Sequence, residues 1–344
     1  MPAPASITPS PHAPSPSVAA AHSPDSGRHI AVVYNPIKVD VARLEKLVRA
    51  AEVSAGWAST QWFATSVEDG GQAVTRTAVS RKASVVLAVG GDGTVRAVAE
   101  ALRGTGVAIA LAPTGTGNLL ARNLNLPLAH LEGSVRTAFT GNDRAIDLGV
   151  AEIWRVDGTR EEHVFLVMAG LGLDAKMIAL TNPRLKKAVG WLAYVDGGMR
   201  AISDLGPVKL RFSIDGSPER TTSVHTIIVG NCGALPGGIL LMPDAQPDDG
   251  ILDIAALKPR GPFGWFKVWN KVTWENGLLR RSAFGRSIID LRSDVRDVLY
   301  ATARDMQMTV EVPQEFQLDG DGFGEAKAVH AWVDAGALTV KVPG

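Results

Sequence analysis

A glycine-rich turn with a single carboxylate is the part of this sequence best suited to chemistry. Val85–Val89 is a short apolar run, typical of a buried strand, and Gly90–Thr94 (Gly-Gly-Asp-Gly-Thr) follows it directly. Apolar residues then recur at helical spacing from Val95 to Leu102. A turn without side chains at the start of a helix leaves backbone N–H groups exposed, which is what a phosphate group needs. We therefore expect a phosphate-binding turn at this position.

Asp92 stands inside this turn and would by itself repel a phosphate group. Its presence predicts either a divalent cation or a network of hydrogen-bond donors between carboxylate and phosphate. A second glycine loop, Gly115–Gly117, follows the apolar run Val107–Ala112, and two strand ends that converge on one crevice favour a nucleotide. The glycine spacing matches neither the dinucleotide fingerprint nor the lysine-containing phosphate loop. A turn that serves only the local backbone stays the alternative.

Strand and helix patterns alternate between His29 and Leu124, and these elements must position the loops. The alternation predicts a parallel sheet covered by helices. In such sheets, ligands bind beyond the carboxyl ends of the strands. The loops Asn35–Val39, Gly90–Arg96 and Thr114–Asn118 are all expected at that edge.

The pattern changes after about Ala145, where short apolar runs are separated by Gly, Pro and Asp turns. This spacing predicts a mainly β domain, either a sandwich or an open barrel. The expected elements include strands at Val164–Ala169, Leu210–Ile214, Val224–Val229, Leu252–Leu257, Met308–Val312 and Leu338–Val342, and helices near Leu185–Ser203 and Pro262–Leu279.

These patterns divide the chain into four parts. Residues 1–27 are rich in Pro, Ala and Ser, and we expect a disordered tail there. An α/β domain is expected over residues 28–150 and a strand-rich domain over residues 151–336. Residues 337–344 form a terminal strand that could return to the first domain.

Composition excludes several classes of function. Basic and acidic residues number 35 each, so charge gives no argument for nucleic-acid binding. The single cysteine, Cys232, excludes an intrachain disulfide and fits a reducing compartment. No apolar run approaches the roughly 18 residues that cross a bilayer, so any membrane contact is expected to be peripheral.

Five groups of residues, taken in order, resemble the catalytic domain of the diacylglycerol kinase type of lipid kinases. This family includes the soluble bacterial diacylglycerol kinases and is related to the sphingosine and ceramide kinases. The resemblance extends over nearly all of residues 29–344. The groups are Tyr34-Asn35-Pro36; Gly90–Thr94 with Pro113–Asn118; Ala169–Ala175; Gly230-Asn231 with Gly237-Gly238, Pro243–Ala245 and Asp249–Asp253; and Gln317–Asp321.

The resemblance implies ATP and Mg²⁺ as cofactors and a two-domain plan like that of NAD kinases and phosphofructokinases. In the family, a magnesium ion is held around an Asp-Gly-x-Leu motif of the second domain. Here this implies the Asp249 carboxylate, with the backbone carbonyls of Gln246 and Ile251. The residues implied for ATP are Asn35, Pro36, Lys38, Thr65, Ser66, Gly90, Gly91, Asp92, Gly93, Thr94, Gly115, Thr116, Gly117 and Asn118.

The resemblance also implies a proton acceptor near the C-terminus. It corresponds to Asp321 in the sequence Asp-Gly-Asp, where the more familiar family motif is Asp-Gly-Glu. The shorter side chain leaves Asp319 as a second candidate, while Asp92 serves the metal and phosphate end. Phosphoryl transfer needs such groups, because it depends on charge neutralisation, alignment and a positioned base. From the residues alone, an Asp-Gly pair also fits a surface turn.

The resemblance thus implies a lipid kinase that transfers the γ-phosphoryl group of ATP to a lipid hydroxyl, with diacylglycerol, giving phosphatidic acid, as the leading substrate. We expect a cytoplasmic enzyme in peripheral contact with the inner membrane face and without a nucleic-acid partner. The oligomeric state stays open, a homodimer included. An NAD kinase-like enzyme and a non-catalytic nucleotide or lipid sensor of the same fold are the alternatives. The basic, tryptophan-containing segment Pro262–Arg286 either lies in a membrane interface or packs on the sandwich.

Overall fold

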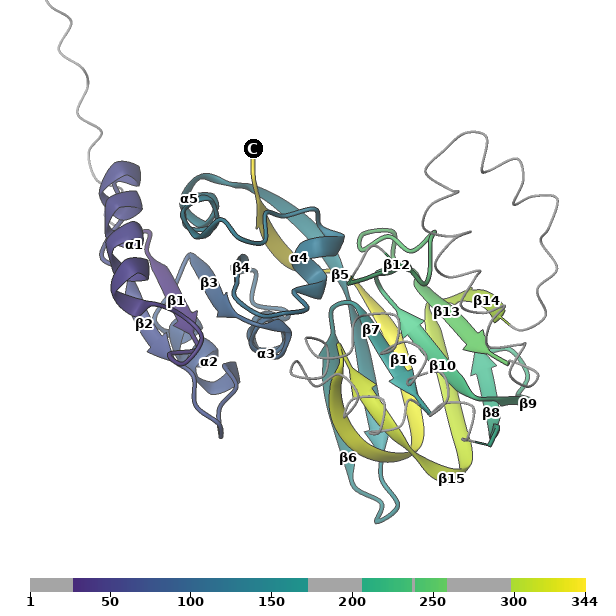
Figure 1. Ribbon diagram of the computed structural model, residues 1–344. Helices are drawn as coiled ribbons and strands as arrows, with labels where there is room; N and C mark the ends of the chain where they lie inside the picture. The colour runs from purple at the N-terminus through teal and green to yellow at the C-terminus, as the bar shows by residue number, and fades with distance from the viewer. Residues whose placement is uncertain (1–26, 173–205, 237–238, 259–297) are drawn as a thin grey trace, which may run out of the picture.

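The computed structural model describes residues 27–172, 206–236, 239–258 and 298–344, which are coloured in Figure 1. The expected tail, apart from its last residue, lies outside the described residues. The same holds for the helices expected near Leu185–Ser203 and Pro262–Leu279, and for the rest of the segment up to Arg286.

The N-terminal part is the predicted α/β domain, with four parallel strands in the order β4-β3-β1-β2. Both faces of the sheet are covered, so β3 is a continuous apolar run: Val85, Leu87 and Val89 pack with α1 and α5. Val86 and Ala88 pack with α2 and α3 on the other face. The elements are β1 (Ile30–Tyr34), α1 (Val41–Ala55), β2 (Gln61–Ala64), α2 (Gln72–Ser80), β3 (Val85–Gly90), α3 (Asp92–Leu102), β4 (Ala108–Pro113), α4 (Leu119–Asn123) and α5 (Leu131–Thr140).

The C-terminal part is rich in strands, as predicted, and has a core of its own. Phe165, Phe316 and Leu318 are fully buried in that core. The strands are β5 (Asn142–Trp154), β6 (Arg160–Phe165), β7 (Met168–Leu171), β8 (Val208–Ile214), β9 (Arg220–Val224), β10 (Thr226–Gly230), β11 (Ala234–Leu235), β12 (Ile239–Leu240), β13 (Leu252–Leu257), β14 (Val298–Ala303), β15 (Asp305–Leu318) and β16 (Asp321–Val342).

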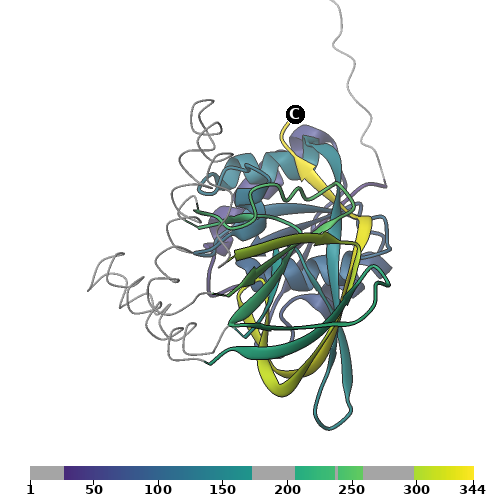
Figure 2. The same cartoon turned by 90° about the vertical axis from the view of Figure 1, so that its right-hand side faces the viewer.

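One long strand, β16, belongs to both parts of the molecule. It pairs with β15 in the strand-rich part, and its end pairs with β4 at Val340 and Ile109. Along most of its length it also pairs antiparallel with β5. Figures 1 and 2 show the yellow β16 running from the strand-rich part to the C-terminus beside the α/β sheet. Residues 338–342 are thus the end of this strand, and position 150 falls inside β5.

The strand expected at Val164–Ala169 is two strands, β6 and β7, and Asp319 causes the break. Its carboxylate accepts hydrogen bonds from the backbone N–H groups of Leu166, Val167 and Met168, at 2.8 to 3.0 Å. Asp319 also donates its own N–H to the carbonyl of Met168. These three N–H groups therefore donate to the Asp319 side chain, and the strand is interrupted between β6 and β7. Asp319 and Gly320 form the turn between β15 and β16 with positive φ angles of 51° and 89°, as a tight hairpin requires.

We predict that Asp319→Ala lowers the free energy of unfolding by about 3 kcal/mol or more, since three buried N–H groups lose their acceptor at roughly 1–3 kcal/mol each. Urea unfolding measures this change. The matched control is Asp157→Ala, because Asp157 accepts hydrogen bonds from Thr159 in an exposed turn. That variant should leave the free energy of unfolding nearly unchanged. Equal stability of the two variants would contradict the anchoring role.

Candidate active site

The two glycine loops predicted from the sequence lie against each other at the end of the parallel sheet. Gly90, the last residue of β3, pairs with Pro113, the last residue of β4. A Cβ atom added to Gly115 would lie 2.7 Å from the Cα of Gly91, so this approach requires glycine. The two turns therefore present backbone edges, without side chains, at the edge where ligands of such sheets bind.

Asp92 ties the two loops together. Its carboxylate accepts hydrogen bonds from the N–H of Asn118 at 2.8 Å and from the N–H of Leu119 at 2.5 Å, where α4 begins. A Cβ atom on Gly117 would lie 2.5 Å from Asp92 Oδ2. The donors around this carboxylate are backbone N–H groups. Each carboxylate oxygen of Asp92 is held by the backbone of the neighbouring loop.

The other residues of the two loops mostly fix the backbone. The side-chain amide of Asn118 accepts from the N–H of Gly115 and donates to its carbonyl. Thr94 lies against Gly90, where a Cβ atom would be 2.6 Å from the Thr94 Cβ. Thr116 is exposed at the tip of the second loop. The structure thus brings the residues Gly90–Thr94 and 115–118 into one place.

The first loop of the chain reaches this place through Lys38. Its Nζ lies 3.6 Å from the position of a Cβ atom on Gly91, so the ammonium group faces the glycine turn. Asn35 and Pro36 begin the same loop, and Asn35 Oδ1 accepts the N–H of Ile37 at 3.0 Å. A cation beside bare backbone N–H groups adds to the positive potential that favours phosphate.

Thr65 and Ser66 follow β2, at the far end of the strand order from β4. The N–H of Thr65 donates to the carbonyl of Tyr34. The hydroxyl of Ser66 accepts from the N–H groups of Glu68 and Asp69 and donates to the Glu68 carboxylate at 2.8 Å. Ser66 therefore serves its own turn in this structure, and no hydrogen bond among the described residues links it to the glycine turns.

The two carboxylates of the Asp-Gly-Asp segment have different surroundings. Asp319 is the buried anchor described above, and burial raises its pKa to about 6 while its three N–H partners oppose the rise. Asp321 has a half-exposed side chain and reaches the first turn of α3, where its Oδ2 lies 2.9 Å from the position of a Cβ atom on Gly93. Of the two, only Asp321 lies at the glycine turn.

The residues expected to hold Mg²⁺ lie in the loop before β13. Asp249 accepts the N–H of Ile251 at 3.0 Å, and burial, with the nearby Asp147 and Asp248, raises its pKa. Burial also raises the pKa of Asp253 to about 6, with Asp249 and Asp244 adding to the rise. The described residues contain no cluster of three or more His, Cys, Asp or Glu side chains that could hold a metal ion.

Arg96 was expected only as the last residue of the loop Gly90–Arg96, without a role of its own, and it lies one turn after Asp92 in α3. Its Nη2 is 3.3 Å from Asp321 Oδ2, and its guanidinium lies 4.6 Å from the centre of the Phe323 ring. Only 11% of its side chain is exposed. A charged residue inside the apolar stretch of a helix was the one available signal, since such residues are rarely buried without a partner.

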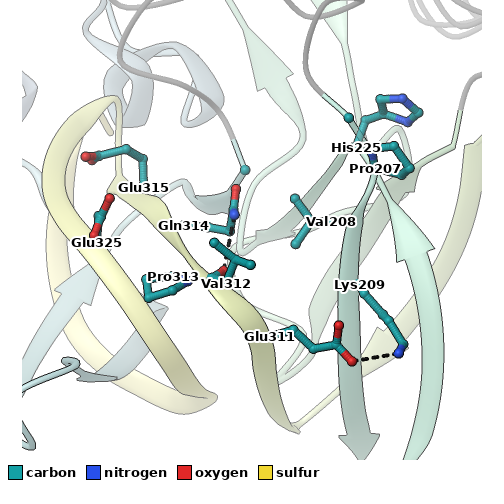
Figure 3. Close-up of a pocket in the computed structure, with 12 residues that line it drawn as sticks. Pro207, Val208, Lys209, His225, Glu311, Val312, Pro313, Gln314, Glu315 and Glu325 are labelled. Atoms are coloured by element: carbon teal, nitrogen blue, oxygen red, sulfur yellow. Dashed lines mark hydrogen bonds and ion pairs between the residues drawn. The ribbon is translucent and has the colours of Figure 1, made fainter.

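A cavity of about 510 Å³ lies in the strand-rich part, between the start of β8 and the irregular segment of β15 (Figure 3). Val208 and Val312 line it with apolar surface. Lys209 and Glu311, joined by an ion pair of 2.6 Å, line it as well. None of the residues predicted from the sequence for ATP, metal or proton transfer lines this cavity.

The helices of the described residues are all too short or too polar to pass through a lipid bilayer.

Comparison with known proteins agrees with this arrangement. Residues 29–151 match the family model of the diacylglycerol kinase catalytic domain, and residues 167–274 match that of the YegS C-terminal NAD kinase beta sandwich-like domain. A diacylglycerol kinase of Mycobacterium tuberculosis is 30% identical over 177 residues, which are 52% of this chain and 56% of that protein. A "Probable lipid kinase YegS-like" protein of Pseudomonas aeruginosa is 35% identical over 195 residues, 55% of this chain and 60% of that protein.

These alignments cover less than two thirds of either relative. The fold extends further: a crystal structure of a diacylglycerol kinase from Bacillus anthracis covers 91% of this chain and 96% of its own, with a TM-score of 0.64 and 18% identity. The family models, the relatives and the glycine loops agree: the chain carries, in this order, a segment similar to a diacylglycerol kinase catalytic domain and a segment similar to a YegS C-terminal domain.

Proposed function

We propose that this protein is an ATP-dependent lipid kinase, which transfers the γ-phosphoryl group of ATP to a lipid hydroxyl. Diacylglycerol, giving phosphatidic acid, is the proposed substrate. The names of its relatives support a lipid kinase. The observation that carries the proposal is the position of Asp321, which extends from the strand-rich part to the first turn of α3, beside the glycine loops.

In the proposed complex, the polyphosphate of ATP lies on the backbone edges of Gly90–Gly93 and Gly115–Gly117. Lys38 faces this turn and would neutralise part of the phosphate charge. Phosphoryl transfer depends mainly on such alignment and charge neutralisation. Asp92 keeps the two loops in register through its bonds to Asn118 and Leu119, so its contribution is to the shape of the phosphate site.

Asp321 is the proposed proton acceptor. Within the described part of the chain, its Oδ2 is held by Arg96, and its Oδ1 accepts no hydrogen bond. That oxygen can take the proton of the acceptor hydroxyl while the new bond to phosphorus forms and the bond from phosphorus to the ADP oxygen breaks. A base in this position accelerates transfer by roughly 10²–10⁴-fold.

Mg²⁺ would serve this reaction in complex with ATP and, separately, in the loop before β13. Several carboxylates lie near one another there: burial raises the pKa of Asp249 and of Asp253, with Asp147 and Asp248 adding to the rise at Asp249, and Asp249 and Asp244 adding to it at Asp253. Carboxylate and carbonyl oxygens are the ligands that Mg²⁺ prefers, so Asp249 with the carbonyls of Gln246 and Ile251 fits such an ion. When bound, the ion would neutralise this charge and fix the loop.

The lipid acceptor places the proposed enzyme at a membrane. We propose peripheral contact with the inner face of the cytoplasmic membrane, since the acceptor hydroxyl of a diacylglycerol lies at the bilayer surface. A nucleic acid is not among the proposed partners, because the net charge of the chain is zero. Whether two copies act together is left to a measurement of the oligomeric state.

The first experiment offers the purified full chain γ-labelled ATP, Mg²⁺ and, one at a time, vesicles with diacylglycerol, ceramide, sphingosine or polyprenol, and free NAD. We expect label in phosphatidic acid, above the background of vesicles without acceptor. Label in NADP alone would replace the proposal by an NAD kinase-like activity. Nucleotide binding without transfer to any acceptor would favour a sensor.

We predict that Asp321→Asn lowers kcat by about 10²–10⁴-fold. The KM for ATP should change less than about twofold, because the amide keeps the shape of the side chain but cannot take the proton. Steady-state kinetics with diacylglycerol vesicles measure both constants. Asp157→Ala serves again as the control, in an exposed turn. A variant with the kcat of the wild type would exclude Asp321 as the base.

Gly117→Ala should weaken ATP binding at least about tenfold, because the new Cβ atom would lie 2.5 Å from Asp92 Oδ2 and must displace one loop. Isothermal titration with a non-hydrolysable ATP analogue measures the Kd. Gly206→Ala is the matched control, because no atom of the described residues lies within 4 Å of its added Cβ. Equal Kd values for the two variants would place the nucleotide away from these loops.

A further inference from the structure

Arg96 is a buried cation whose contacts converge on one carboxylate and one ring of the opposite domain. Its Nη2 lies 3.3 Å from Asp321 Oδ2, and its guanidinium lies 4.6 Å from the centre of the Phe323 ring. Asp321 and Phe323 are two residues apart on β16, the spacing that puts both side chains on one face of a strand. Arg96 therefore fits into a corner that these two side chains form.

This corner is poorly built for stability. The single ion-pair contact is long, and half of the Asp321 side chain is exposed, so the pair contributes little to the free energy of folding. The Nε of Arg96 is buried and has no hydrogen-bond partner among the described residues. Burying a guanidinium with an unpaired N–H costs free energy. The contacts of Arg96 with Asp321 and Phe323 therefore contribute little to the stability of the fold, and we look for their role in the reaction.

Other residues than Arg96 hold α3 against the strand-rich part. Arg103, after the end of the helix, pairs with Glu162 at 2.8 Å and with Asp334 at 2.6 Å. Glu100, one turn after Arg96, accepts the N–H of Val164 on β6 at 3.2 Å. These contacts join α3 to β6 and β16 without Arg96.

We infer that Arg96 is a positioning residue for the transfer step: it holds Oδ2 of Asp321 over the first turn of α3 and so aims Oδ1 at the acceptor hydroxyl. The inference rests on the proposed function. The guanidinium of Arg96 lies against the ring of Phe323, and a planar guanidinium can stack on such a ring, whereas an ammonium group has no plane to stack. Oδ1 of Asp321 is then already oriented toward the acceptor hydroxyl before the lipid binds.

The test is a double-mutant cycle of Arg96→Met and Asp321→Asn with diacylglycerol vesicles, because methionine keeps much of the packing on Phe323 and removes the charge. Arg96→Met should lower kcat about 10–10²-fold in the wild-type background, with the KM for ATP changed less than about twofold. In the Asp321→Asn background, the same substitution should change kcat less than about twofold. Equal losses in both backgrounds, or no loss, would overturn the inference.

Arg103→Met is the matched control on the same helix. It removes the ion pairs with Glu162 and Asp334, so it should lower the melting temperature while kcat stays within about twofold of the wild type. Arg96→Lys should recover only part of the loss in kcat, since lysine lacks the planar fork. Full recovery by lysine would overturn the geometric part of the inference.

A crystal structure of the Arg96→Met variant separates the inference from the proposed function. If the wild type phosphorylates none of the acceptors, the proposed function fails. The crystal structure of the variant then still tests whether Arg96 positions the Asp321 carboxylate. We expect the Asp321 carboxylate to leave its place over Gly93 in the variant. A carboxylate that stays there would show that Arg96 does not position it.

Discussion

The pairing of β16 with strands of both domains is the constraint on which the candidate site depends. One half of the site, the glycine loops, follows β3 and β4, and the other half, Asp321, is the first residue of β16. Because β16 pairs with β15, β5 and β4 in turn, its backbone hydrogen bonds fix where Asp321 stands relative to α3. A carboxylate from the distant end of the chain thereby meets a turn near its start.

Carboxylates that hold backbone N–H groups are a recurring device in this molecule. Asp92 holds the start of α4, Asp319 holds the β6–β7 connection, and Asp147 holds the N–H groups of Gly250 and Gly336 at 2.7 Å each. In each case the carboxylate satisfies donors that no strand or helix pairs. Asp321 differs, since its partner is a side chain and half of it is exposed. This contrast separates the reactive candidate from its neighbours.

Much of the fold could be predicted from local patterns. The strand β13 was predicted with its bounds, and the glycine loops were placed together because parallel strands end at one edge of a sheet. The family resemblance added the ordered motifs. The helix α5 and most of β5 were missed: α5 is short, although its apolar residues recur at helical spacing, and Asp147 and Gly149 interrupt the apolar residues of β5.

The parts of the site that could not be predicted depend on partners far away in the sequence. The break after Phe165 is set by Asp319, and Arg96 is identified only by its contact with Asp321, 225 positions later. The tight turn of Asp319 and Gly320 was indistinguishable from a surface hairpin in sequence, since the same residue types serve both. Only the fold shows that one carboxylate of this turn is buried and the other exposed.

The irregular pairing between Asp334 and Leu338, with Gly336 at a φ angle of 63°, interrupts the β5–β16 ladder between the two halves of the molecule. On either side of it, continuous backbone pairing resists bending. Torsion of one half against the other should therefore collect at this joint. Asp147 accepts hydrogen bonds from the N–H groups of Gly336 and Gly250 at once, so it ties this joint to the loop before β13 and limits how far the joint can twist.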